Sequence, residues 1–139
     1  YIELEITESL FSKDPTEIIK KLFKLKELGT KIAIDDFGSG YSSLNRLKMV
    51  PFDRIKIDKS IIDNIDLDEK SAPITKTIIL LAAAFKAGIT AEGVETVDQA
   101  DFLKSMLCGE IQGYYYSRPL TSEALEEFLR KEADNASIN

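Results

Sequence analysis

Two adjacent aspartates, Asp35 and Asp36, end a strand-like segment and precede a glycine-rich turn, residues 37–40. Like charges placed side by side cost free energy unless a cation or a basic group lies between them. Other polar side chains end further strand-like segments in the same way: Glu5, Lys56, Glu92 and Gln112. Carboxylate and amide oxygens suit hard divalent cations. The pattern therefore predicts a metal-dependent active site at the mouth of a parallel β/α structure.

The composition excludes several other chemistries. The chain has 139 residues, of which 44% are hydrophobic and 30% charged, as expected for one modest globular domain. It contains no histidine, which excludes Ser-His-Asp and Cys-His mechanisms and any histidine-ligated zinc site. The net charge of −6, with no basic run, argues against binding to duplex nucleic acid. An anionic ligand remains compatible if a metal supplies the positive charge.

The cysteine content and the apolar segments indicate a cytoplasmic location. Cys108 is the single cysteine, so no disulfide can form within the chain, and a reducing compartment fits. We interpret Cys108 as a small core residue rather than a nucleophile. The longest apolar stretch, residues 78–85, is too short to span a bilayer, so this segment is expected to make no membrane contact. A parent protein could still be tethered to a membrane elsewhere.

The elements that must position the polar residues alternate along the chain. Apolar and polar residues alternate as in strands at 1–7, 31–35, 54–58, 89–92 and about 110–114. Helical spacing of apolar residues, with capping residues and breakers, predicts helices at about 14–28, 42–48, 71–85, 97–107 and 121–130. Five βα units in a row predict a parallel sheet covered by helices.

Side-chain alternation within the strands favours a barrel. In the strands at 1–7, 31–35 and 54–58, isoleucine and leucine occupy one face, which we expect to pack under the helices. The other face is polar, which a closed barrel tolerates and an open doubly wound sheet does not. On that face Glu3 could pair with Lys31 or Arg54. The fold class is thus α/β, a TIM-type barrel, which typically takes about 250 residues. The chain is predicted to be a C-terminal portion of about five βα units, residues 1–131, followed by a polar tail, residues 132–139.

Five motifs follow one another in a specific order and spacing: Glu5-Ile6-Thr7-Glu8, DDFGSGYSSL at 35–44, Lys56-Ile57-Asp58, AEGVET at 91–96 and QGYYYSRP at 112–119. Together they resemble the second half of an EAL domain, the bacterial cyclic di-GMP phosphodiesterase family. The resemblance covers essentially residues 1 to 130. It implies a TIM-type barrel, cyclic di-GMP as ligand, and a two-metal site holding Mg²⁺ or Mn²⁺ in the intact domain.

The resemblance also implies roles for individual residues. Glu5 and Asp35 match ligands of a first divalent metal. Asp35, Asp36 and Glu92 match the shell of a second metal or its water, and Glu92 also matches an assigned general base. Lys56 matches the catalytic lysine that contacts the nucleophilic water and the phosphate side of the site.

Three further residues match positions around this centre. Gln112 matches a residue that lines the site near the metals, and Glu95 matches a position near a guanine, so both are predicted to bind substrate. Glu8 matches a carboxylate that holds the glycine-rich loop. The chain departs from the family pattern at Lys86, where a helix-ending glycine is expected. Because Gly88 follows two residues later, we expect that turn to be re-formed.

The family's namesake Glu-Ala-Leu strand and its metal-binding asparagine are expected upstream of residue 1. The tripeptide Glu123-Ala124-Leu125 is a chance match, because it follows a Thr/Ser cap inside an amphipathic helix. Without the missing ligands, and with strand edges open, we expect catalysis by this chain alone to be impaired.

Most of these residues also have a structural explanation. Asp35 and Asp36 could belong to a solvated turn, and Lys56 could be a counter-ion for carboxylates inside the barrel. Glu92 could interact with the dipole of the following helix. Gln112 could make structural hydrogen bonds, and the tyrosines at 114–116 are expected to pack rather than to stack on bases.

The leading functional prediction is a metal-dependent phosphodiesterase that hydrolyses cyclic di-GMP to linear pGpG in bacterial second-messenger signalling. The alternative is a catalytically inactive EAL domain that binds cyclic di-GMP or a partner protein. A third hypothesis is an unrelated metal-using TIM-barrel enzyme that acts on a phosphorylated metabolite. By the same resemblance the intact domain is expected to form a homodimer through the element after the glycine-rich loop.

Overall fold

The computed structural model describes residues 2–11, 16–40, 44–63, 65 and 70–136. The strands form one five-stranded sheet in the order β1-β2-β3-β4-β5, and every neighbouring pair is parallel. The strands are β1 (Glu3–Thr7), β2 (Lys31–Phe37), β3 (Arg54–Ile57), β4 (Gly88–Ala91) and β5 (Glu110–Ile111). The helical elements are η1 (Glu8–Phe11), α1 (Thr16–Glu27), α2 (Leu44–Leu47), α3 (Lys59–Ile62), α4 (Ser71–Ala84), α5 (Val97–Ser105) and α6 (Ser122–Ala136). The predicted βα alternation is confirmed.

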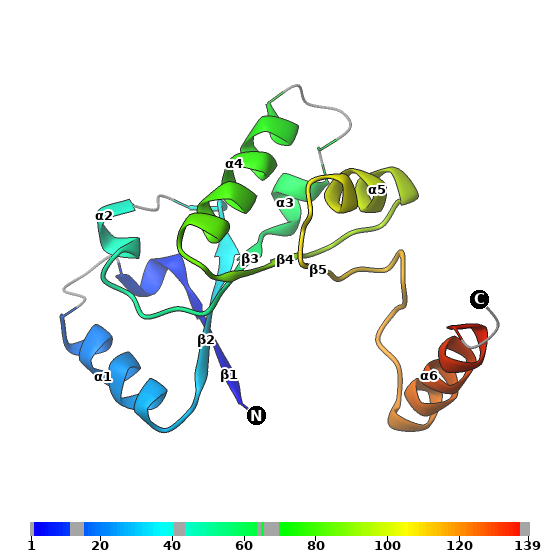
Figure 1. Ribbon diagram of the computed structural model, residues 1–139, viewed down its shortest axis with the longest axis horizontal. Helices are drawn as coiled ribbons and strands as arrows, with labels where there is room; N and C mark the ends of the chain where they lie inside the picture. Colours follow the sequence, from blue (N-terminus) through cyan, green and yellow to red (C-terminus); the bar gives the residue numbers. More distant parts are fainter. Residues whose placement is uncertain (1, 12–15, 41–43, 64, 66–69, 137–139) are drawn as a thin grey trace.

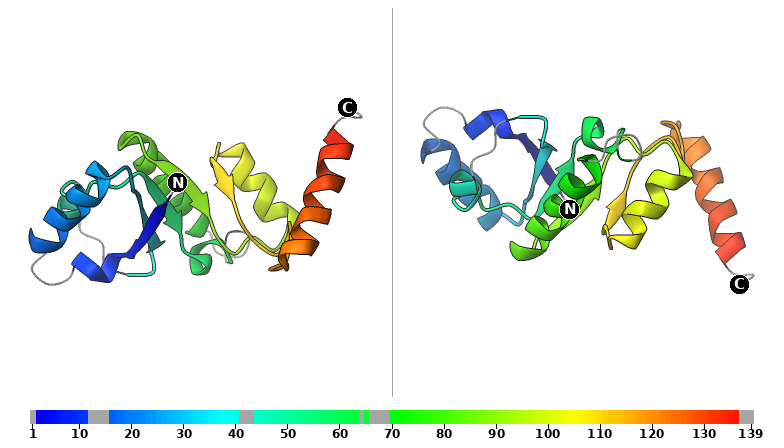
Figure 2. Two further views of the ribbon diagram at one scale, coloured as in Figure 1. Left: turned by 90° about the horizontal axis from the view of Figure 1, so that it is seen from below. Right: turned by 90° about the horizontal axis from the view of Figure 1, so that it is seen from above.

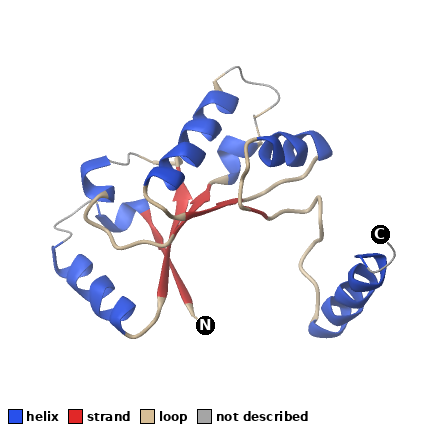
Figure 3. Ribbon diagram, in the orientation of Figure 1, coloured by secondary structure: helices blue, strands red, loops and turns tan. Residues whose placement is uncertain are grey.

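Helices α1, α4 and α5 lie beside the sheet, whereas α6 stands apart from it at the end of an extended segment (Figures 1 and 3). Apolar side chains of the packed helices form the core together with the strands. Helix α1 packs on β2, and α4 packs on β3 and β4. The core centres on fully buried isoleucines of the middle strands, among them Ile34, Ile55 and Ile57. Burial of apolar area is the main favourable contribution to folding, so these strands anchor the sheet.

The expected burial of the apolar strand faces is confirmed for β2 and β3 but is only partly correct for β1. Ile2 is 67% exposed and Leu4 is 37% exposed, whereas Ile6 packs against the core. Strand β1 is at the edge of the sheet, and α1 covers the neighbouring β2 instead. The start of β1 therefore lacks a helix above it among the described residues.

On the polar face of the sheet, Glu3 forms an ion pair that the sequence predicted. The Arg54 guanidinium contacts Glu3, with Nε 3.1 Å from Oε1, and it also contacts Glu110, with Nη1 2.7 Å from Oε1. Arg54 Nη1 donates a hydrogen bond of 3.0 Å to Thr90 Oγ1. Of the two partners considered for Glu3, the structure thus pairs it with Arg54.

The last strand and the last helix differ in length from the prediction. Strand β5 ends at Ile111 rather than near Tyr114, because the chain turns around Val94. Gly113 lies so close that an added Cβ would be 2.0 Å from Val94 O, and Tyr115 N–H donates to the same oxygen. Only glycine permits this approach.

Helix α6 continues to Ala136 rather than ending at Arg130. Pairs at i,i+4 spacing, Glu126 with Arg130 and Glu127 with Lys131, support the helix. The proposed domain boundary at residue 131 remains a prediction. Glu123–Leu125 lies within α6, as expected for a chance tripeptide. Figure 2 shows α6 at the opposite end of the molecule from α1.

The expectation that Gly88 would allow a re-formed turn after α4 is wrong. Lys86 itself adopts the left-handed conformation, with φ of 58°. The amide of Lys86 donates to Ala83 O and that of Ala87 donates to Ala82 O, the pattern of a Schellman cap. Leu107 ends α5 in the same way, with φ of 58°. The hydrogen bonds of the cap therefore outweigh the strain of a left-handed residue other than glycine.

Candidate active site

Four predicted site residues meet where the carboxyl ends of the strands lie together. Lys56 Nζ is 2.6 Å from Glu5 Oε1, 3.0 Å from Asp35 Oδ1 and 2.8 Å from Glu92 Oε1. The parallel register explains this convergence, since β1, β2, β3 and β4 are consecutive neighbours. Glu5 and Asp35 lie two residues before the ends of β1 and β2, Lys56 lies one residue before the end of β3, and Glu92 directly follows β4. The side chains that the sequence placed at separate strand ends form one ionic cluster.

Lys56 is held as a cation by this cluster. The side chain is buried, and burial is the largest single influence and acts to lower its pKa. Hydrogen bonds to Glu5, Glu92 and Asp35 together outweigh burial and raise the pKa of Lys56 well above its ordinary value. A lysine with a raised pKa stays protonated at neutral pH, so Lys56 provides a fixed positive charge and cannot act as a base.

A bulge in β2 brings Asp36 to the same site as Asp35. Strict alternation would direct two consecutive side chains to opposite faces of the sheet. The pairing of β2 with β3 shifts its register between Ile34 and Phe37, and Asp36 has a φ of 53°. Bulges re-aim side chains in this manner and are frequent near active sites. Sequence alternation alone did not predict this orientation.

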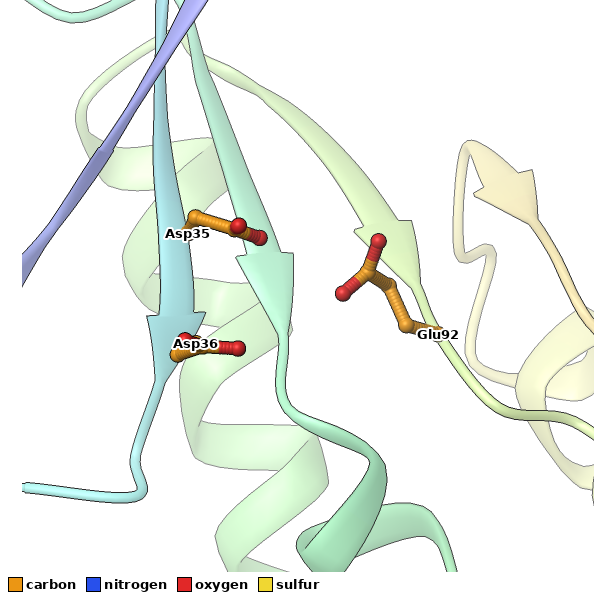
Figure 4. Close-up of side chains that lie close together, drawn as sticks. All are labelled: Asp35, Asp36 and Glu92. Carbon is orange, nitrogen blue, oxygen red and sulfur yellow. The ribbon is translucent and has the colours of Figure 1, made fainter.

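The three acidic residues Asp35, Asp36 and Glu92 form a set that fits a divalent cation (Figure 4). Each offers one carboxylate oxygen, and these oxygens lie within 4.8 Å of one another. Asp35 Oδ1 is buried, and the charged Lys56 Nζ lies 3.0 Å from it. An all-oxygen set of carboxylates this close together has the donor chemistry that suits hard divalent cations such as Mg²⁺ or Mn²⁺.

Negative charge is concentrated at Asp36. Its pKa is raised by desolvation and next by the charges of Asp35 and Asp58. Asp58 follows β3 directly, caps α3 by accepting from Ser60 N at 3.0 Å, and adds a further carboxylate beside Asp36. The sequence interpretation assigned no role to Asp58, although its position just after a strand end was the signal used for the other residues.

The two predicted substrate-binding residues, Gln112 and Glu95, line a common pocket beside the ionic cluster. The remaining lining residues are Lys59, Gly93, Gly113 and Tyr114. Glu95 forms an ion pair with Lys59. The backbone of Gln112 bridges two segments, since its N–H donates to Ala91 O and its C=O accepts from Val94 N. The structural role considered for Gln112 is thus present in its main chain, while the residue also faces the pocket.

The structure says less about the other residues considered in the sequence, which are Glu8, the tyrosines at 114–116 and Cys108. The side chain of Glu8 lies outside the described part of the structure, so its role as a support of the glycine-rich loop stays a prediction. Tyr115 and Tyr116 pack edge to face with ring centroids 5.0 Å apart. Tyr114 is 53% exposed and lies under the Arg118 guanidinium. Burial raises the pKa of the Cys108 thiol, which makes it a poor nucleophile, as its interpretation as a packing residue requires.

A parallel β/α sheet with acidic residues gathered near the carboxyl ends of its strands is the arrangement of a partial TIM-type barrel. Residues 1–119 match the family model of the EAL domain. The chain therefore belongs to the EAL domain family. No helix in the described part of the chain is long and apolar enough to cross a membrane.

Known relatives agree with this membership. Cyclic di-GMP phosphodiesterase NbdA of Pseudomonas aeruginosa is 44% identical over 130 residues, which are 94% of this chain and 17% of that protein. A solved PaMucR phosphodiesterase in complex with c-di-GMP has a TM-score of 0.84 and 40% identity, over 88% of this chain and 50% of that one. The Klebsiella pneumoniae BlrP1 complex with manganese and cyclic di-GMP has a TM-score of 0.78 and 32% identity, over 84% of this chain and 30% of that one. The chain thus spans half or less of each of these relatives.

Proposed function

We propose that the domain containing this chain hydrolyses cyclic di-GMP to linear pGpG in bacterial second-messenger signalling. The observation that carries the proposal is the convergence of Glu5, Asp35, Lys56 and Glu92, with Asp36 beside them, at one rim of the sheet. Family membership and the cyclic di-GMP complexes of similar structures support the choice of substrate.

Each residue has a distinct part in the proposed reaction. Glu5, Asp35, Asp36 and Glu92 would hold two divalent cations, Mg²⁺ or Mn²⁺. Bound cations of this kind lower the pKa of water and neutralise charge on a phosphodiester during in-line attack. Lys56, fixed as a cation, attracts the anionic phosphate and orients the attacking water.

Glu92 is the proposed proton acceptor, because its carboxylate belongs to the acidic set beside which the attacking water would lie. The attack breaks one of the two phosphodiester bonds of the ring, and the leaving ribose oxygen takes a proton. The pocket lined by Gln112 and Glu95 would receive part of the nucleotide beside the broken bond. Because the substrate is an intracellular messenger, we expect the domain to act in the cytoplasm.

The direct test measures conversion of cyclic di-GMP to pGpG by the complete protein with Mg²⁺ or Mn²⁺. Glu92→Gln should lower kcat by about 10²- to 10⁴-fold, the usual contribution of a general base. Glu17→Gln is the matched control, since Glu17 lies exposed on α1 and pairs only with Lys20 in the contacts described. Cyclic di-GMP binding without any turnover in the unchanged protein would instead support the inactive, ligand-binding alternative.

We also propose that the intact domain forms a homodimer through the region after the glycine-rich loop. Exposed apolar side chains support this choice, since Leu44 on α2 is 58% exposed and Met49 just after it is 54% exposed. Light scattering coupled to gel filtration tests the proposal. Leu44→Glu should shift the complete protein toward the monomer, and an unchanged mass would contradict this interface.

A further inference from the structure

The turn that follows Glu92, residues 93–96, is held in place from the outside. Val94 is fully buried, and its N–H donates to Gln112 O while its C=O accepts from Tyr115 N. Gly93 has a φ of 70°, a conformation that favours glycine. This turn determines where the Glu92 carboxylate points, because Glu92 lies between it and the end of β4.

Lys59, the first residue of α3, covers this turn. An added Cβ at Gly93 would lie 2.3 Å from Lys59 Cγ and 2.7 Å from Lys59 Cδ, so the aliphatic part of Lys59 lies directly on Gly93. Its ammonium group pairs with Glu95 two residues further along the turn. Asp63, one helical turn after Lys59, is 3.8 Å from the same ammonium group. Lys59 thus contacts the turn with both its stem and its charge.

Gln99 makes a second connection between α3 and the same turn. This buried side chain accepts hydrogen bonds from Glu95 N at 2.8 Å and Thr96 N at 3.1 Å through Oε1. Its amide Nε2 donates to Ile62 O, at the end of α3, at 3.3 Å. Both ends of α3 are therefore attached to the turn, Lys59 at its start and Ile62 at its end.

Helix α3 itself continues directly from the strand that carries Lys56. Asp58 lies between them and caps α3. The two proposed catalytic side chains, Lys56 and Glu92, therefore belong to segments connected through α3, with Lys59 and Gln99 as the connecting groups. A shift of α3 relative to the turn would change the separation of Lys56 and Glu92.

We propose that Lys59 is a positioning residue that fixes Glu92 against Lys56 and the cation site by pairing with Glu95 and covering Gly93. This inference rests on the proposed function for its kinetic consequence, but its structural part is independent of it. Residues that orient a metal ligand from outside commonly change metal affinity or activity by about 10- to 100-fold when they are replaced. Misplacement of a reacting group by about 1 Å has a comparable effect on rate.

The test compares three substitutions in the complete protein. Lys59→Met keeps the stem and removes the charge, Lys59→Ala removes both, and Lys59→Arg keeps both. We expect kcat for cyclic di-GMP to fall by about 10-fold in Lys59→Met and further in Lys59→Ala, by more than any rise in KM, with rescue in Lys59→Arg. Lys104→Met is the matched control, because it removes an exposed pair with Asp101 on α5, away from the turn.

Two measurements without turnover complete the test. Mn²⁺ titration followed by electron paramagnetic resonance should show affinity about 10-fold weaker in Lys59→Met. Amide hydrogen exchange of a peptide covering residues 93–96 should be faster in Lys59→Met, because the turn loses the ion pair between Lys59 and Glu95 and opens more often.

The outcomes separate this inference from the proposed function. A rise in KM with unchanged kcat would make Lys59 a substrate contact and would overturn the positioning role. Unchanged kcat, Mn²⁺ affinity and exchange in Lys59→Met would overturn it as well, while turnover by the unchanged protein would still support the function. If the unchanged protein bound Mn²⁺ without turnover, the function would fail, and faster exchange with weaker Mn²⁺ binding in Lys59→Met would still support the positioning role.

Discussion

Two charged clusters lie on the same face of the sheet, one near each end of its strands. At the amino end, Arg54 contacts Glu3 and Glu110 and donates to Thr90. At the carboxyl end, Lys56 contacts three carboxylates. Arg54 and Lys56 are two residues apart on β3 and therefore point to the same side.

The two clusters differ in how completely their charges are satisfied. Hydrogen bonds to Glu110 and Glu3 raise the pKa of Arg54 against the opposing effect of desolvation, the largest single influence. At the other end three carboxylates share one lysine, against two that share Arg54, and Asp36 adds a further carboxylate beside them. In barrels of this type the carboxyl end carries function and the amino end carries stability. The larger excess of negative charge thus lies at the carboxyl end of the strands, where the cation site is expected.

The largest expected effect is that of removing the cation from the carboxyl-end cluster. Lys56→Met preserves the length of the side chain but leaves Glu5, Asp35 and Glu92 without their shared counter-charge. Turnover of cyclic di-GMP should fall by about 10²- to 10³-fold, as when one electrostatic contact to the transition state is lost. Steady-state kinetics with Lys24→Met, an exposed α1 variant, as control measures this. Turnover within about threefold of the unchanged protein would mean that the cluster is only structural.

The next effect concerns the response to metal. Ions that bind only the folded state should stabilise it by about 2.7 kcal/mol at 100 times their dissociation constant. Thermal unfolding with and without Mn²⁺ should show a shift that Asp35→Asn removes, because Asp35 belongs to the acidic set. Glu110→Gln, at the amino-end cluster, should keep the shift. If both variants lost the Mn²⁺-induced shift equally, the two clusters would not differ in metal binding.

The amino-end cluster should affect stability rather than activity. Arg54→Met removes the partner of Glu3 and Glu110, so the free energy of unfolding should fall by about 1–3 kcal/mol, as for lost hydrogen bonds to charged groups. Urea unfolding measures this change. Turnover per folded molecule should stay within about threefold of the unchanged protein, since Arg54 is not part of the cation site. A large loss of kcat without loss of stability would show that the amino-end cluster has a catalytic role, which would contradict the difference drawn between the two clusters.

The sequence predicted the convergence of Glu5, Asp35, Lys56 and Glu92 because period-two alternation and parallel pairing determine where strand ends meet. It did not predict the orientation of Asp36, because a bulge with a left-handed residue has no alternation signal. Helix α3 was also missed. A helix of 4 residues is too short to show helical spacing of apolar side chains, and its cap Asp58 was assigned to the strand motif instead.

The predicted ends of α4 and α5 lie within two residues of the observed ends, but the left-handed conformation that follows a helix was predictable only where glycine marked it. Gly29 ends α1 as expected, with φ of 86°. Lys86 and Leu107 end α4 and α5 in the same conformation without that signal. Tertiary packing and the hydrogen bonds of the cap determine these turns, and neither is visible from residue type.

The smallest expected effect is on the free energy of unfolding when a left-handed residue is replaced by glycine. Two such residues are compared, Leu107 at the end of α5 and Asp36 at the cation site. Leu107 is 85% exposed and has φ of 58°, so Leu107→Gly should relieve strain with little loss of packing. We expect a gain of about 0.5–1 kcal/mol in the free energy of unfolding, with unchanged Mn²⁺ affinity.

Asp36→Gly is the matched change at the site, because Asp36 has φ of 53° and a raised pKa caused by desolvation and by nearby carboxylates. It should also stabilise the metal-free protein, since it removes strain together with an unfavourable negative charge. Unlike Leu107→Gly, it should weaken Mn²⁺ binding, which isothermal titration calorimetry measures. If Mn²⁺ affinity were the same in both variants, Asp36 would be an ordinary strained turn residue, and the bulge in β2 would have no connection with the cation site.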